Sequence, residues 1–379
     1  MKETKLTRAL DILSRILVGG VFLFSSFVKG VDPMGTAFKV QEYMTAWTVG
    51  SVGFEWATPW ATPLAMALIC AEFLVGVLML TGSWRQLGAW LLAAMMAFFT
   101  VTTLADALTN KVTDCGCFGD AIKLTNWQTF GKNVALDIPT LIIFLGRKWP
   151  RKKRFEHDSL VGVLSILAMA LFGLYNIKNE PVIDFRPWKV GNQMIAQDDG
   201  LKMQSFLTYK DKATGETREY VSAEVPYNDS AWMAGHEFVD SRVVDPYEIK
   251  ADGFSMVGPD GEDHARDIVG SPDYTVVATL HHIEDIDKQG VRALRSAHRY
   301  CQENGIDMVL LTSALTEDAE AFLYEHGLSD MPYYFADATA IETMLRSNPG
   351  FVLLKEAKVL GKWSVANARK LQEYPFQIE

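Results

Sequence analysis

The chain of 379 residues is long enough for two or three domains, and 49% of its residues are hydrophobic. Its formal net charge of -10 excludes nucleic acid as a partner, because phosphate binding needs a concentrated basic surface. Apolar runs dominate up to about residue 177, and charged, polar and apolar residues alternate after it. The composition therefore predicts an integral membrane protein with the lipid bilayer as a partner, followed by a water-soluble part.

Five apolar runs in the first half of the chain predict membrane-spanning helices. A helix rises about 1.5 Å per residue against a hydrocarbon layer of roughly 30 Å. The fourth run is the shortest, and it spans only if flanking residues join it or the bilayer thins. The runs cover about 10–28, 64–81, 87–108, 134–145 and 160–177.

Basic residues near the ends of these runs predict the orientation. They lie before the first run, between the second and third, and between the fourth and fifth. In a five-span bundle these places share one side, which the positive-inside rule makes cytoplasmic. We therefore expect residues 31–63, residues 109–130 and the C-terminal part outside the cytoplasm. The basic residues are Lys2, Lys5, Arg8, Arg85 and the run 147–154.

The soluble part has two patterns. Short alternating stretches with turn signals predict a strand-rich adaptor, and from about residue 249 strands and helices alternate and end in a hairpin and a helix. The second pattern predicts an α/β domain. The expected domains are a four-helix membrane domain over 1–150, a basic loop and fifth span over 151–180, the adaptor over 181–248, and the α/β domain over 249–379.

Two of the four cysteines stand close together in Cys115-Gly116-Cys117, just before the fourth run. Cysteines one residue apart close a disulfide only through a small strained ring, and Gly116 lowers the cost of that ring. Strain makes a disulfide easier to reduce, which suits exchange better than structural support. We predict that Cys115 and Cys117 are redox-active, with a static disulfide or a metal role as alternatives. No metal site is expected, because two thiolates do not complete tetrahedral coordination.

Four carboxyl groups are supporting candidates. Asp114 and Asp120 flank the cysteines and would disfavour a thiolate nearby. Glu72 and Asp137 lie inside predicted spans, where an ionisable group is costly to bury. For these two, a role in proton transfer or at a quinone stands beside hydrogen-bonded packing within the bundle. Cys70, close to Glu72, is expected to fill the core, or else to act as a third exchanging thiol.

Three stretches resemble the DoxX and MauE families of small four-helix bacterial membrane proteins, over about residues 8–146. They are the run 15–24 followed by Lys29-Gly30, the segment 71–76, and Cys-Gly-Cys-Phe-Gly at 115–119. The resemblance implies a bacterial inner-membrane location and a redox role. It also implies quinone as a candidate cofactor and an extracytoplasmic thiol or disulfide protein as a candidate partner. A methylamine substrate is not implied, because those short proteins lack the fifth span and the soluble domain.

The chain from residue 249 resembles the thioredoxin-like fold of TlpA type. An entry strand is expected around 254–256, and the first core strand ends at His281. Pro349 stands before the final hairpin, where that fold keeps a cis-proline. The loop that should contain Cys-x-x-Cys has no cysteine, and Cys301, in a predicted helix, is expected to be a packed thiol. The domain is therefore predicted to lack thiol exchange.

The same loop is rich in histidine and acidic residues. His281, His282, Glu284, Asp285 and Asp287 could together bind a metal, but such residues at a strand end usually form a solvated loop. We expect a solvated loop here.

Two functions remain open from the sequence. The first is a membrane redox protein, in which Cys115 and Cys117 pass disulfide or electrons to an extracytoplasmic partner. If it is an enzyme, it is a thiol-disulfide or quinone-linked oxidoreductase. The second is a non-enzymatic binding or assembly factor with a structural disulfide.

Overall fold

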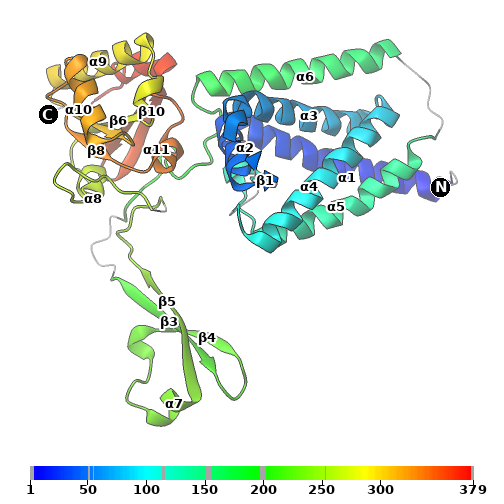
Figure 1. The fold of residues 1–379 in the computed structure, drawn as a ribbon, viewed down its shortest axis with the longest axis horizontal. Coiled ribbons are helices and arrows are strands. Elements are labelled where there is room, and N and C mark those ends of the chain that lie inside the picture. The colour runs from blue at the N-terminus through cyan, green and yellow to red at the C-terminus, as the bar shows by residue number, and fades with distance from the viewer. Residues whose placement is uncertain are drawn as a thin grey trace. The chain divides into compact units, whose positions relative to one another are not determined.

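The computed structural model describes residues 4–49, 52–53, 55–112, 116–149, 155–196, 202–251 and 253–376 (Figure 1). The chain divides into two compact units, Met1–Arg186 and Pro187–Glu379. The first unit is helical and the second mixes helices and strands (Figure 1).

Five helices of the described residues are long and apolar enough to cross a membrane, which confirms the predicted number of spans. The fourth of them begins at Asn126, well before the apolar run at Val134, so flanking polar residues do join it. Thr125 caps this helix by accepting a hydrogen bond from the backbone of Gln128. The spanning helices are α1 (Lys5–Val31), α3 (Ala61–Thr81), α4 (Arg85–Thr109), α5 (Asn126–Gly146) and α6 (Phe155–Lys178).

Helix α1 occupies the centre of the bundle, where it packs against α3, α5 and α6. It approaches α3 closely through glycine: a Cβ atom on Gly76 would lie 2.8 Å from the Leu23 side chain. Small residues permit such close packing between membrane helices. Val18, Phe22 and Leu78 are buried in this core, while many leucines on the outer faces are exposed, as lipid contact requires.

A short segment between α1 and α3 contains α2 (Pro33–Ala46), the strands β1 (Thr48–Val49) and β2 (Val52–Gly53), and the 3-10 helix η1 (Glu55–Trp60). Asp32 caps α2 by accepting from the Gly35 N–H at 3.0 Å. Trp56 and Trp60 are largely exposed. Their location at the membrane interface stays a prediction.

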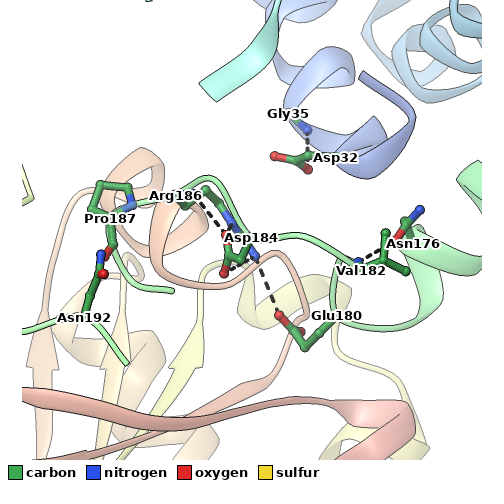
Figure 2. A network of polar contacts seen from close by, with 9 residues as sticks. All are labelled: Asp32, Gly35, Asn176, Glu180, Val182, Asp184, Arg186, Pro187 and Asn192. Carbon is green, nitrogen blue, oxygen red and sulfur yellow. Dashed lines mark hydrogen bonds and ion pairs between the residues drawn. The ribbon is translucent and has the colours of Figure 1, made fainter. Parts of the chain in front are cut away.

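Polar contacts fix the chain where it leaves α6. The amide group of Asn176 donates to the Gly30 carbonyl oxygen at 3.0 Å. The side-chain oxygen of Asn176 accepts from the Val182 N–H at 3.1 Å (Figure 2). The end of the last spanning helix is thereby tied to the end of the first.

Arg186 lies a few residues further on and is buried. Its Nε donates to Asp184 at 2.8 Å, and its guanidinium also pairs with Glu180 at 3.6 Å (Figure 2). Burial alone would lower the pKa of Arg186, but the carboxylates of Asp184, Asp32 and Glu180 raise it above its ordinary value. The guanidinium therefore stays charged, balanced by carboxylates of the same unit.

The second unit begins with a three-stranded antiparallel sheet in the order β4-β3-β5. Tyr209, Tyr220, Trp232 and Phe238 pack edge to face on it. The strands predicted in the adaptor region are thus present. The elements are β3 (Gln204–Asp211), β4 (Thr217–Val221), η3 (Ser222–Glu224), α7 (Ser230–Gly235) and β5 (His236–Val244).

The rest of the unit has a five-stranded sheet in the order β10-β9-β6-β7-β8, with helices on both faces. Strands β6, β7 and β8 are parallel, and β9 and β10 form the antiparallel hairpin. The Asn348-Pro349 bond before β9 is cis. This topology is thioredoxin-like, as predicted. The strands are β6 (Thr275–Leu280), β7 (Asp307–Thr312), β8 (Tyr333–Phe335), β9 (Gly350–Lys355) and β10 (Lys358–Ser364).

Two details differ from the sequence expectation. The entry strand around 254–256 is reduced to single bridges from Val257 to Asp263 and to Phe335. The final helix is the 3-10 helix η5 (Val365–Leu371). The other helices are α8 (Ala265–Val269), η4 (Ile283–Asp285), α9 (Lys288–Glu303), α10 (Thr316–Glu325) and α11 (Ala338–Met344).

Candidate functional site

The cysteine motif lies between α4 and α5, directly before the 3-10 helix η2 (Gly119–Ala121). Cys117 is disulfide-bonded. Cys70 and Cys301 are free thiols. Asp114 and Cys115 lie outside the described residues. Gly116 has a φ of 60°, in the left-handed region that glycine adopts without steric cost, so the motif uses its glycine for backbone conformation.

Cys117 is joined to the interior of the bundle through its backbone. The Ser25 hydroxyl of α1 lies 2.8 Å from the Cys117 carbonyl oxygen and 2.9 Å from a Glu72 carboxylate oxygen. The other Glu72 oxygen pairs with the Lys29 ammonium at 2.5 Å. Glu72 is 1% exposed and Lys29 7%, so the cysteine motif is in contact with a buried ion pair.

The Ser25 hydroxyl has one hydrogen for two oxygen partners. An ionised Glu72 carboxylate can only accept, so Ser25 must then share its hydrogen between Glu72 and Cys117. The Ser25 hydroxyl therefore links the Cys117 backbone to the Glu72 carboxylate.

Aromatic and cationic groups complete the surroundings. The Phe118 ring packs on Phe24 of α1 at 5.4 Å, and the Lys132 ammonium lies 4.5 Å from the centre of the same ring. Lys132 also interacts electrostatically with Lys29 and Glu72. Two lysines and one carboxylate thus gather beside the motif, and a positive charge there would favour a nearby anion such as a thiolate.

The other predicted residues lie in different environments. Asp137 of α5 accepts a hydrogen bond from Thr100 of α4 at 2.9 Å, which suits its packing interpretation. Asp120 is exposed on η2. Of the predicted carboxyl groups that the structure describes, Glu72 is the one linked to Cys117 by the contacts above.

Sequence reasoning missed Ser25 and Lys132, and it quoted Lys29 only as part of a run. A serine and two lysines near helix ends are typical of interface anchors, so composition alone gave no signal. Their one sequence clue is position: Phe22, Ser25 and Lys29 recur at intervals of three and four, which places them on one face of α1.

The loop in the place of the thioredoxin active site starts at the end of β6. The Asn348 side chain donates to the His282 carbonyl at 2.6 Å, so the loop is held against the cis-proline turn. Asp287, predicted as a loop carboxylate, caps α9 by accepting from the Gly290 N–H at 2.7 Å. The loop contains no cysteine.

Two buried ionisable groups of this domain, one in the loop and one near the end of α9, have shifted pKa values. Burial raises the pKa of the Cys301 thiol to about 12. Burial lowers the pKa of His281 to about 4, so the imidazole is neutral at physiological pH. Cys301 is therefore a protonated, packed thiol and a poor nucleophile.

Residues 7–146 match the family model described as "Methylamine utilisation protein MauE". The match covers α1 to α5, less than half of the chain, and confirms the MauE resemblance; the DoxX resemblance stays a prediction. No curated protein shows significant sequence similarity to this chain.

Solved structures resemble the chain weakly. The thioredoxin domain of a thiol-disulfide oxidoreductase from Bacteroides vulgatus is 14% identical, with a TM-score of 0.26 over 32% of this chain and 93% of that one. StoA from Bacillus subtilis is 16% identical, with a TM-score of 0.25 over 32% and 93%. A thioredoxin-like protein from Bacteroides caccae is 12% identical, with a TM-score of 0.24 over 83% of each chain. At these values the likenesses carry no argument about function.

Proposed function

We propose that this multi-pass membrane protein is a thiol-disulfide oxidoreductase of the bacterial inner membrane, with Cys115 and Cys117 as its exchanging pair. The observation that carries the proposal is the contact of Cys117, through Ser25, with the buried pair of Glu72 and Lys29. A disulfide that only stabilised the loop would not need a buried ion pair next to it, and the burial of two charges is costly.

The proposed reaction moves two electrons and two protons. A thiolate of an extracytoplasmic dithiol protein attacks one sulfur of the pair and forms a mixed disulfide, while the other sulfur leaves as a thiolate and takes up a proton. The second thiol of the partner then loses its proton and resolves the mixed disulfide. The partner is left oxidised and the pair is left as two thiols.

A membrane quinone would complete the cycle as the oxidant. It would accept two electrons and two protons from the reduced pair and leave as the quinol, while the disulfide re-forms. The ammonium groups of Lys29 and Lys132 would favour the thiolate during both half-reactions. Glu72, through Ser25, is the proposed group for proton transfer to and from the pair.

The basic residues at the helix ends support an orientation with the motif and the second unit outside the cytoplasm. In this arrangement the thioredoxin-like domain would meet the partner without exchanging disulfides itself, because its loop lacks cysteine. A reporter fused after residue 379 that is active only in the cytoplasm would contradict this orientation.

A second candidate is a non-enzymatic binding or assembly factor. Two observations favour it. The thioredoxin-like loop has no cysteine, and the Cys117 carbonyl oxygen is held by a hydrogen bond from Ser25 of α1. In that case the disulfide would fix the loop, and the soluble unit would bind a partner.

Differential alkylation of native membranes followed by mass spectrometry separates the two functions. Free thiols are blocked first, the disulfides are then reduced, and the new thiols receive a second label. The exchange function predicts that Cys115 and Cys117 are found in both states, and that added reductant or oxidant shifts the ratio. A pair that stays fully oxidised under every condition supports the binding factor.

A further inference from the structure

The place where a thioredoxin-like domain carries its active site is occupied here by donor groups of another kind. His281 and His282 follow β6, and Glu342 comes from α11. One donor atom from each residue lies within 4.8 Å of the others. The three side chains belong to one domain and meet beside the cis-proline turn, because Asn348 bonds to the backbone of His282.

His281 has the geometry of a prepared ligand. Its Nε2 lies 3.4 Å from the Arg346 carbonyl oxygen, which suits an Nε2–H that donates and a Nδ1 that carries the lone pair. The residue is only 8% exposed, and among the residues that the structure describes no hydrogen-bond partner is found for the buried Nδ1. A buried polar nitrogen without a partner is costly, and a bound ion would remove that cost.

Neighbouring groups hold the histidines in place. Histidine ligands of metals commonly donate their other ring N–H to a backbone carbonyl, and the Arg346 carbonyl stands at that place for His281. The backbone carbonyl of His281 accepts a hydrogen bond from the Ser313 hydroxyl. The His282 ring stands edge-on to His281, with ring centres 5.3 Å apart, and its Nδ1 lies 3.5 Å from Glu284. One ring nitrogen of each histidine is thus engaged, and the other ring nitrogen is the candidate ligand atom.

We propose that His281, His282 and Glu342 form a binding site for a divalent transition-metal ion, with Zn²⁺ as the best match. Two imidazoles and one carboxylate suit Zn²⁺ better than Mg²⁺ or Ca²⁺, which prefer all-oxygen sites. Three protein ligands leave a fourth position of a tetrahedral ion for water or for a donor from a bound partner.

The inference departs from the expectation of a solvated loop. The acidic residues expected beside the histidines, Glu284, Asp285 and Asp287, are not the ones that complete the group. Glu284 lies 3.5 Å from the Nδ1 of His282, and Asp287 caps α9. Glu342 lies far along the chain and reaches the histidines only through the fold. The site is also independent of the cysteine pair, so either proposal can fail without the other.

The test is a Zn²⁺ titration of the purified full-length protein in detergent, freed of metal and with the cysteine pair oxidised so that its thiolates cannot bind. Competition with a chromogenic chelator gives the affinity and the stoichiometry. We expect one Zn²⁺ per chain, and loss of affinity by about tenfold or more in His282→Ala and in Glu342→Gln. His157→Gln, a change of an exposed histidine in the other unit, should leave the affinity unchanged.

Co²⁺ provides a spectroscopic check, because a four-coordinate Co²⁺ site absorbs strongly in the visible range and a hydrated ion does not. The band should appear with one equivalent of Co²⁺, disappear in His282→Ala and be displaced by Zn²⁺. The His282 side chain is 43% exposed, so this variant should fold even if Glu342→Gln does not. Absence of stoichiometric binding, or binding that His282→Ala leaves unchanged, would overturn the proposal.

Discussion

Ser25 of α1 donates a hydrogen bond to the carbonyl oxygen of Cys117, 2.8 Å away, and its hydroxyl also contacts Glu72 at 2.9 Å. One side chain therefore joins the cysteine motif to the buried ion pair of the bundle. If Glu72 serves the redox chemistry of the pair, the coupling must pass through this hydroxyl.

Ser25→Ala should disturb the redox equilibrium of the cysteine pair and leave the bundle folded. The substitution removes the shared bond and leaves the Cys117 carbonyl without this donor, at a cost of about 1–3 kcal/mol. Equilibration in glutathione buffers followed by alkylation gives the oxidised fraction at each potential. Ser26→Ala is a matched control, because Ser26 is also buried but bonds to its own helix at Leu23. An equal response of the two variants would contradict the coupling.

The Lys29–Glu72 pair gives a test of stability. Removal of one partner leaves the other charge buried and should destabilise the bundle by roughly 3–5 kcal/mol. Lys29→Met and Glu72→Leu should each lower the thermal midpoint of the protein in detergent, and the double variant should recover most of the loss. A double variant whose loss equals the sum of the single losses would show that the two groups do not interact.

Gly116→Val should impair the cysteine pair without loss of protein. Gly116 has a φ of 60°, and a left-handed conformation costs other residues about 1–2 kcal/mol, more for β-branched ones. The measurements are the oxidised fraction of the pair and the abundance of the protein in membranes. Gly131→Val is the control, because a Cβ atom there meets nothing within 4 Å. If the disulfide is instead structural, Gly116→Val should lower the abundance and the thermal resistance of the protein together with its function.

Most of the membrane fold could be predicted because lipid-facing helices leave long apolar runs. The start of α5 could not be predicted in this way, because Asn126, Thr129 and Asn133 are polar yet buried against the bundle. Polar residues that face a protein interior interrupt an apolar run in the sequence although the helix continues. The thioredoxin-like topology was predictable for a similar reason, since its strands are short buried apolar runs separated by amphipathic helices.

The candidate sites were predictable only in part. Cys117 could be found from its motif, and Glu72 from the cost of a carboxylate in a membrane helix. Ser25 and Lys132 could not be found from the sequence, because their contacts depend on which helices pack together. Glu342 was missed for the same reason, as only the packing of α11 brings it to His281.

Cys301 should be inert in the folded protein. Alkylation requires the thiolate, and a pKa of about 12 leaves almost none of it at pH 8. Native protein treated with iodoacetamide at pH 8 should remain unlabelled at Cys301 and react fully after unfolding, as mass spectrometry of the peptides would show. Rapid labelling of native Cys301 would contradict its burial in α9 and reopen the question of exchange by this domain.

Trapping tests exchange by the cysteine pair. In the reverse of the proposed reaction, the lone thiolate of Cys115→Ser or Cys117→Ser attacks the disulfide of the oxidised partner, and no second cysteine is present to release the mixed disulfide. We expect a covalent adduct in native membranes that reductant dissolves, present in at least one single variant and absent from the variant with both substitutions. If neither single variant forms an adduct while the wild-type pair stays oxidised under every growth condition, the exchange function is wrong.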